Sequence, residues 1–220
     1  MKKIECVIFD MDGTLFDTSE GIFDSYAHVA KTFKKTVPEL KDMYGLIGGP
    51  LKMNLKSTFG LNDDESENAV DTYRRHYSSV GIKKSKMYPN VKSTIQALYN
   101  DKVVLGVATL KRQDFAGQFI EKGGLMDFFK SVKGMDAEDR LSKEILIKNC
   151  MAECHARSET TLVVGDSTSD LNGAQYNDAH FLAVTWGFGF DAEFCIANNI
   201  PYVSRFEDII AYISETLMNS

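Results

Sequence analysis

The sequence predicts an α/β fold, in which a doubly wound parallel-sheet core carries an all-helical cap inserted after the first strand. The main observation is a set of three short apolar runs rich in β-branched residues, at 6–9, 103–108 and 161–165. Segments with helical spacing of apolar residues separate them, an alternation typical of parallel strands joined by crossover helices. The stretch 15–86 shows helical patterns and no convincing strand, so we expect it to form the insertion.

The domain boundaries follow from these patterns. We expect a core made of residues 1–14 and 87–220, and a helical cap made of residues 15–86. Within the cap, helical spacing predicts helices at 17–33, 39–44, 51–59 and 63–80. In the core it predicts helices at 91–99, 112–122, 142–154, 171–176, 191–198 and 206–218. Shorter apolar pieces predict further strands at 181–184 and 202–203, and an edge piece at 128–132.

Composition and charge exclude several classes of protein. The chain has 220 residues, 44% of them hydrophobic, which is ordinary for a globular protein with a real core. Its net charge of −6 gives no global attraction for nucleic acid or anionic lipid, so we expect neither as a partner. No apolar run approaches the roughly 20 residues of a membrane span. Met1 leads straight into a strand, so no signal peptide is expected.

The four cysteines, at positions 6, 150, 154 and 195, show no C-x-x-C pattern. Cys150 and Cys154 lie one helical turn apart, which favours a buried helix face over a zinc site. Free thiols fit a reducing compartment, so we expect a cytoplasmic protein. A monomer or a weak homodimer is the expected oligomeric state.

Carboxylates follow the first predicted strand. Asp10 and Asp12 come directly after residues 6–9, and Gly13 then turns the chain. Charge beside an apolar core is stable only when it is paired, protonated or bound to a metal. Because alternate residues of a strand point to opposite sides, Asp10 can reach into a crevice while Asp12 swings over it. This geometry suits a nucleophile and a proton-transfer partner.

Other polar side chains are predicted to reach the same edge of the sheet, where the carboxyl ends of parallel strands lie. Thr109 follows the second strand, Asp166 ends the third with Asp170 close behind, and Lys143 opens a helix between them. Up to four carboxylates in one crevice need a counter-charge, which Mg²⁺ supplies when bound by carboxylates, waters and a substrate phosphate. With an ammonium, a hydroxyl and the backbone N–H groups of the 11–13 turn, this set predicts phosphoryl transfer.

Four motifs in this order resemble those of the haloacid dehalogenase (HAD) superfamily of phosphatases. They are Asp10-Met11-Asp12-Gly13-Thr14, Ala108-Thr109-Leu110-Lys111, Lys143, and Gly165-Asp166-Ser167-Thr168-Ser169-Asp170. The helical stretch between the first two motifs resembles the C1-type cap of the phosphoglycolate-phosphatase-like subgroup. The resemblance covers essentially the whole chain. It implies a Rossmann-like core and a Mg²⁺-dependent phosphatase whose partner is a small phosphorylated metabolite.

The resemblance also implies roles for single residues. Asp10 is expected to attack phosphorus and form an aspartyl-phosphate, and Asp12 to protonate the leaving oxygen and then activate water. The implied Mg²⁺ ligands are the Asp10 carboxylate, the Asp12 backbone carbonyl and Asp166. Leu110 stands where relatives often carry a small polar residue, so one substrate contact is in question. The implied substrate contacts are Met11, Gly13, Thr109, Leu110 and Lys143.

The phosphate-binding group is a further implication of the resemblance. Thr109 and Lys143 are expected to hold the phosphoryl oxygens, with Asp170 behind them, orienting Lys143 or a metal-bound water. Lys143 is followed by Glu144, where many relatives have proline, so Lys133 is a rival for the lysine role. We favour Lys143, because it lies at the start of a helix that points back toward the strand edge.

More than one function fits these residues. A phosphatase acting on phosphoglycolate, a nucleoside monophosphate or another small phosphomonoester is the leading hypothesis. A phosphomutase of the β-phosphoglucomutase type and a pyrophosphatase are the alternatives, and a non-catalytic phosphate-binding or interaction module is a third class. A dehalogenase is disfavoured, because C–X cleavage needs neither an acid at Asp12 nor a metal cluster. The roles of Gly48, Gly49 and Arg74 in the cap stay open.

Overall fold

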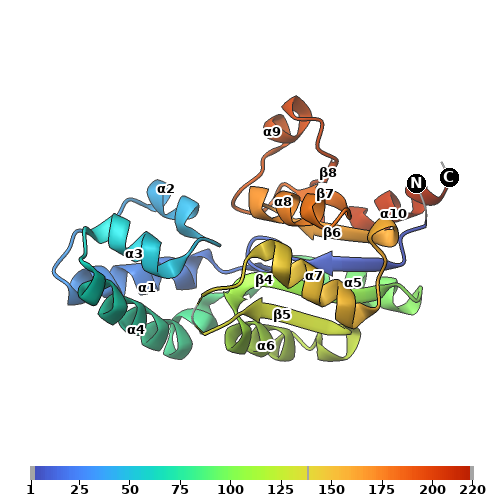
Figure 1. Ribbon diagram of the computed structural model, residues 1–220. Helices are drawn as coiled ribbons and strands as arrows, with labels where there is room; N and C mark the ends of the chain where they lie inside the picture. The colour runs from blue at the N-terminus through green and yellow to red at the C-terminus, as the bar shows by residue number, and fades with distance from the viewer. Residues whose placement is uncertain (1–2, 138, 219–220) are drawn as a thin grey trace. The chain divides into compact units, whose positions relative to one another are not determined.

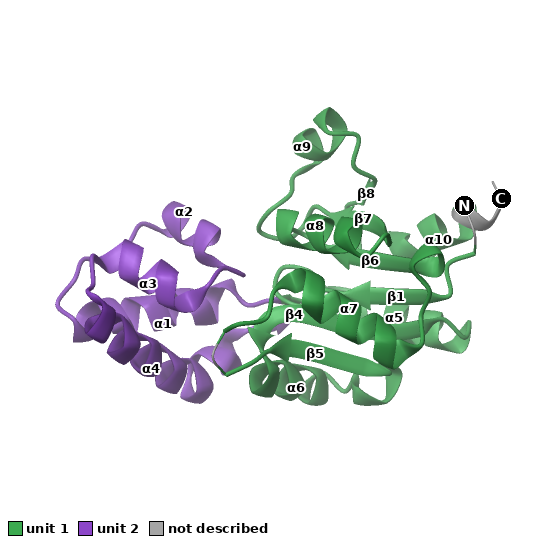
Figure 2. Ribbon diagram, viewed as in Figure 1, with its two compact units in different colours: residues 1–16, 87–220 green, residues 17–86 purple. Residues whose placement is uncertain are grey.

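The computed structural model describes residues 3–137 and 139–218, and the chain divides into two compact units. The core unit runs to Phe16 and resumes at Met87, whereas the helical unit is Asp17–Lys86 (Figure 2). The sequence predicts that the first segment of the core ends at residue 14, whereas in the structure it ends two residues later, at Phe16. Among the described residues, none of the helices has both the length and the apolarity needed to cross a bilayer.

A six-stranded sheet forms the centre of the core unit, in the order β5-β4-β1-β6-β7-β8 (Figure 1). Every pairing between neighbouring strands is parallel. The strands are β1 (Cys6–Phe9), β4 (Val104–Arg112), β5 (Ser131–Met135), β6 (Thr161–Gly165), β7 (His180–Val184) and β8 (Tyr202–Val203). The chain starts in the middle of the sheet and adds strands on both sides, which is the doubly wound arrangement that the sequence predicts.

Helices cover both faces of this sheet. The helices of the core unit are α5 (Val91–Asn100), α6 (Gln113–Lys122), α7 (Lys143–Cys154), α8 (Thr168–Tyr176), α9 (Ala192–Ala197) and α10 (Asp208–Met218), with short 3₁₀ turns at Met126–Phe128 and Ser158–Thr160. On one face, α7 and α8 bury a cluster that includes Ile8, Val163, Leu146 and Ile147. On the other face Phe9 stacks on Phe206, with ring centroids 5.7 Å apart.

The register of the three central strands fixes what meets at their carboxyl ends. Phe9 lies opposite Val107 of β4 and opposite Val164 of β6. One residue later, the N–H of Asp10 donates to the Val164 carbonyl at 2.9 Å. Because side chains alternate along a strand, Asp10 faces the same side as Ile8, which is the side that α7 covers. The strand geometry therefore directs the Asp10 carboxylate toward the start of α7.

The strands differ from the prediction most at β4, at β5 and at the two ends of the helical insertion. β4 does not end before Thr109 but continues to Arg112, with a register shift against β5 between Ala108 and Arg112. Two short strands, β2 (Phe16–Asp17) and β3 (Lys86–Met87), form a separate two-stranded sheet where no strand is expected. The edge piece forms as β5, which starts three residues later than predicted, at Ser131 rather than 128.

The helical unit packs an aromatic centre among its helices. These are α1 (Ser19–Thr32), α2 (Leu40–Met43), α3 (Leu51–Phe59) and α4 (Asp63–Ser79), with 3₁₀ turns at Tyr44–Leu46 and Gly81–Lys84. Tyr26 of α1 is buried and meets Tyr73 of α4 edge to face at 5.4 Å. Asn62 and Glu65 cap α4 reciprocally, each side chain accepting from the backbone N–H of the other.

Candidate active site

An ion pair joins the carboxyl end of β1 to the start of α7. The Lys143 ammonium donates to Asp10 Oδ1 at 2.5 Å and to the Ala108 carbonyl at 2.9 Å. It also lies 2.7 Å from Asp170 Oδ1. These contacts give each of its three N–H groups an acceptor. Lys143 is 4% exposed and Asp10 is 7% exposed, so the pair is held in a fixed, nearly dry position.

The start of α8 holds Asp170 behind this pair. Asp170 Oδ2 accepts from the N–H and the hydroxyl of Ser167, at 3.1 and 2.6 Å, in a capping arrangement. A Cβ on Gly165 would lie 2.3 Å from the Asp170 side chain, so only glycine lets the helix start come this close to β6. Asp170 contacts Lys143, which is one of the two groups, with a metal-bound water, that the family resemblance implies it orients.

Asp166 approaches the turn that follows β1. Its Oδ2 accepts from the Phe188 N–H at 2.7 Å, and its backbone carbonyl accepts from Phe190. Gly13 has a left-handed backbone, with φ of +84°, and a Cβ there would lie 2.2 Å from Asp166 Oδ2. The glycine of the first motif is therefore required both by its conformation and by the close approach of this carboxylate.

Three carboxylates gather where a divalent cation could bind. Asp10, Asp166 and Asp170 each offer an oxygen, and these oxygens lie within 4.8 Å of one another. Burial raises the pKa of Asp10 to about 7 against the opposing effect of Lys143, and burial also raises the pKa of Asp166. Such shifts mark buried carboxylates short of positive charge. Lys143 supplies one positive charge for the three carboxylates, so the site still has hard oxygen donors in excess of cations, which fit Mg²⁺.

Lys111 pairs with Asp12, and the sequence does not single out this contact. Its ammonium lies 2.9 and 3.0 Å from the two Asp12 oxygens, and the two side chains are 6% and 11% exposed. Its backbone N–H donates to the hydroxyl of Thr109, which is buried two residues earlier on β4. Thr109 and Lys111 are two residues apart, so a strand that includes both places their side chains on the same face. This could be inferred from the sequence only if β4 were known to continue past residue 108.

Three expected substrate contacts do not take the predicted form. The Gly13 N–H is not open to an anion, because it donates to the Phe16 carbonyl at 2.9 Å. Met11 is fully buried and its carbonyl accepts from Leu15 and Phe16, so its side chain belongs to the core. Leu110 packs against the apolar cluster under α7. Side-chain alternation turns Leu110 away from the face that carries Thr109.

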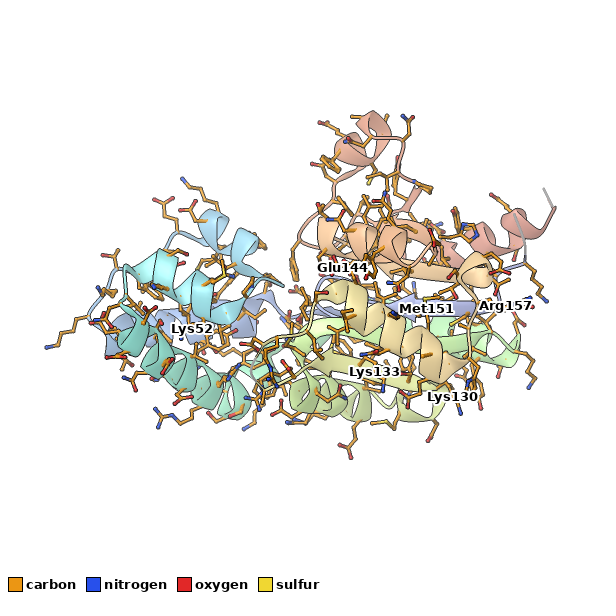
Figure 3. The ribbon with its side chains drawn as sticks, in the orientation of Figure 1. Lys52, Lys130, Lys133, Glu144, Met151 and Arg157 are labelled. Atoms are coloured by element: carbon orange, nitrogen blue, oxygen red, sulfur yellow. The ribbon has the colours of Figure 1, made fainter. Side chains whose placement is uncertain are left out.

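The rival lysine lies elsewhere. Lys133 of β5 forms an ion pair with Glu153, in the last turn of α7, and its side chain is 33% exposed. Figure 3 shows Lys133 on β5 and Glu144 at the other end of α7 from Met151. Glu144 directly follows Lys143, the first residue of α7, whereas Glu153 lies in the last turn. The structure therefore brings Lys143, not Lys133, to Asp10. Gly48, Gly49 and Arg74 belong to the helical unit.

Comparisons with known proteins agree with this geometry. The family model for haloacid dehalogenase-like hydrolases matches residues 7–184. The chain is 29% identical over 186 residues to the tyrosine-protein kinase PtkA of Mycobacterium tuberculosis, spanning 84% of this chain and 63% of that protein. It is 29% identical to a 5′-nucleotidase of Pseudomonas aeruginosa, covering 85% of each, and 28% identical to a phosphoglycolate phosphatase of Vibrio cholerae, covering 86% and 87%.

A solved structure shows the same architecture. The haloacid dehalogenase-like hydrolase SP0104 of Streptococcus pneumoniae superposes with a TM-score of 0.87 at 26% identity. The superposition covers 96% of this chain and 99% of that one. The six-stranded parallel sheet and its flanking helices are therefore the fold of that family.

Proposed function

Because the chain belongs to the haloacid dehalogenase-like hydrolases, we propose that it is a phosphatase that hydrolyses a small phosphomonoester with Mg²⁺ through an aspartyl-phosphate. The observation that carries this proposal is the Asp10 carboxylate, buried and held at 2.5 Å by Lys143 beside Asp166. A 5′-nucleotidase and a phosphoglycolate phosphatase among the relatives support a phosphomonoester as the substrate.

In the first half of the proposed reaction, a carboxylate oxygen of Asp10 attacks phosphorus. The bond from phosphorus to the ester oxygen breaks, and Asp12 gives its proton to that oxygen, so the alcohol leaves neutral. Lys143 holds Asp10 in one orientation before attack. The entropic cost of orienting the attacking carboxylate is therefore met when the protein folds and does not add to the reaction barrier. Thr109 is the hydroxyl proposed to hold a phosphoryl oxygen.

In the second half, water attacks the phosphorus of the aspartyl-phosphate. Asp12, now ionised, takes a proton from that water, the bond from phosphorus to Asp10 breaks, and phosphate leaves. Asp10, Asp166 and the Asp12 carbonyl are the proposed ligands of Mg²⁺. When bound, this cation neutralises charge on the phosphoryl oxygens.

Phosphate release from p-nitrophenyl phosphate tests the proposal. We expect hydrolysis by the wild-type protein with Mg²⁺, loss of hydrolysis in excess EDTA, and recovery when Mg²⁺ is returned. Mild acid quenching during turnover should trap phosphate on the protein, and Asp10→Asn should trap none. A wild-type protein that hydrolyses nothing with any divalent cation would refute the proposed function.

The buried free cysteines agree with a cytoplasmic setting.

A further inference from the structure

The second lysine of the site, Lys111, lies beside Asp12, the proposed acid and base of the reaction. Its ammonium lies 2.9 Å from Asp12 Oδ1 and 5.1 Å from the centroid of the Phe119 ring. A lysine side chain that is 6% exposed has lost most of its hydration, and a buried ion pair seldom stabilises a fold more than apolar residues of the same size would. Stability alone therefore gives little reason for a cation at this position.

The position of Lys111 relative to Asp12 defines the side of the substrate that it meets. In the proposed reaction the ester oxygen lies within hydrogen-bond distance of the Asp12 carboxyl group. The Lys111 ammonium contacts both oxygens of that same carboxyl group, at 2.9 and 3.0 Å. Two hydrogen bonds in sequence span at most about 6 Å, so a group one or two atoms beyond the ester oxygen comes within reach of Lys111.

The other lysine cannot take this task. Lys143 already has three acceptors, on Asp10, Asp170 and Ala108, and it approaches from the nucleophile side. The two lysines thus flank the two ends of the bond that breaks. Because the chain has a net charge of −6, its overall field repels an anionic substrate. A lysine at each end of the breaking bond offsets that repulsion for a substrate that is negative at both ends.

We propose that Lys111 is a specificity residue that binds a second anionic group, a carboxylate or a phosphate, on the leaving side of the substrate. This inference rests on the proposed function and narrows its substrate class to phosphate esters or anhydrides whose leaving group carries a negative charge close to the bridging oxygen. The substrate anion takes over the Lys111 ammonium, and Asp12 is thereby freed from its ion pair.

Two nearly isosteric substrates test the inference. 2-Phosphoglycolate and ethyl phosphate share the O–CH₂ link and differ in ending with a carboxylate or a methyl group. We expect wild-type kcat/KM to be about 10- to 100-fold higher for 2-phosphoglycolate, the range for a charge-assisted hydrogen bond. In Lys111→Met the ratio should fall to within about 3-fold of one, and Lys111→Arg should restore part of it. Because the comparison is a ratio, a general loss of activity through Asp12 cancels.

Lys133→Met is the matched control, since it removes a lysine of the same unit that pairs with Glu153 instead. It should keep the wild-type ratio. Pyrophosphate as a third substrate separates a phosphate from a carboxylate as the preferred anion. An unchanged ratio in Lys111→Met, or a wild-type ratio near one, would overturn the inference and leave the phosphatase proposal standing. If Lys111→Met does not fold, the wild-type ratio and Lys111→Gln decide. No phosphate released from any substrate would refute the proposed function and this inference with it.

Discussion

The core unit and the helical unit use charge in opposite ways. At the carboxyl edge of the core sheet, Asp10, Asp166, Asp170 and Lys143 are all buried. In the helical unit, the ion pair between Lys52 and Glu67 leaves these side chains 44% and 70% exposed. The centre of that unit is aromatic instead, with Tyr26, Tyr73 and Phe59 among its contacts.

The difference shows which charges need an explanation. Exposed pairs keep their hydration and contribute little to folding, so they can be gained or lost freely. Buried charges lose hydration, and their mutual contacts do no more than offset that cost. Four buried charges at one edge are therefore not accounted for by their contribution to stability, which agrees with the proposed binding of Mg²⁺ and phosphate. The predictions below test this contrast, from the largest expected effect to the smallest.

Replacing Asp10, the proposed nucleophile, should separate activity from stability most strongly. We expect Asp10→Asn to lower kcat for p-nitrophenyl phosphate by about 10⁴-fold or more, because the attacking carboxylate is lost. The melting temperature should stay or rise, since a buried charge is removed. Phosphate release and a thermal melt on the same sample measure both effects. Glu67→Gln, at the exposed pair of the helical unit, should change neither, and a large loss of activity there would break the contrast.

Removing the buried lysine should cost stability. Lys143→Met leaves Asp10 and Asp170 buried without their cation, and we expect unfolding free energy to fall by about 3–5 kcal/mol. The Lys133 side chain is 33% exposed and pairs with Glu153. Lys133→Met should therefore lower the unfolding free energy by less than about 1 kcal/mol. Denaturant unfolding of the two variants measures the difference. Equal losses would mean that burial does not decide the cost.

Mg²⁺ should stabilise the protein more at high pH than at low pH. Burial raises the pKa of Asp10 to about 7 and raises that of Asp166, so the metal-free native state keeps protons that the unfolded chain releases above about pH 4. The stability due to these groups is full below that pH and is lost as the pH rises toward 7. Mg²⁺ binds the ionised carboxylates and should raise the melting temperature by about 5 °C at pH 8. The same melts at pH 5 should show a smaller gain, and an equal gain would contradict the raised pKa values.

The smallest effect is expected in the helical unit, where one partly buried histidine titrates. Burial and the neighbouring His28, whose ring stacks on His76 at 4.3 Å, lower the pKa of His76, with Asp24 opposing. A depressed pKa means that stability from neutral His76 is full above about pH 6.5 and is lost as the pH falls below it. An NMR titration should find His76 below the ordinary value, and His28→Gln should move it upward. An unchanged pKa of His76 in His28→Gln would show that the charge of His28 does not affect the protonation of His76.

Long-range features of the fold were predictable where the apolar pattern is strong. Buried parallel strands such as β1 and β6 read as continuous apolar runs, and their shared carboxyl edge follows from the topology. The two-residue strands β2 and β3 have no pattern to read, because two residues cannot show a period. The extension of β4 to Arg112 does not follow from the sequence pattern, because its last four residues are mostly polar and polar residues normally end a buried strand.

The candidate site divides along the same line. Asp10, Lys143 and Asp170 are brought together by strand order and helix position, which the sequence predicts. The contact between Lys111 and Asp12 depends on the continuation of β4, so it could not be inferred from motif spacing. Hydrogen bonds within a turn, such as that of the Gly13 N–H to Phe16, depend on local dihedral angles and not on residue type alone.

The strands β2 and β3 have a consequence for how such proteins diversify. They pair with each other, and the Tyr88 N–H donates to the Leu15 carbonyl at 3.1 Å, so the chain leaves the core and returns to it at neighbouring points. An inserted segment with adjacent ends can be replaced by another, or by a tight turn, without rerouting a single strand of the sheet. The two ends of the helical insertion meet at one point of the core, so a change in its length leaves the positions of Asp10, Lys143 and Asp166 unaltered.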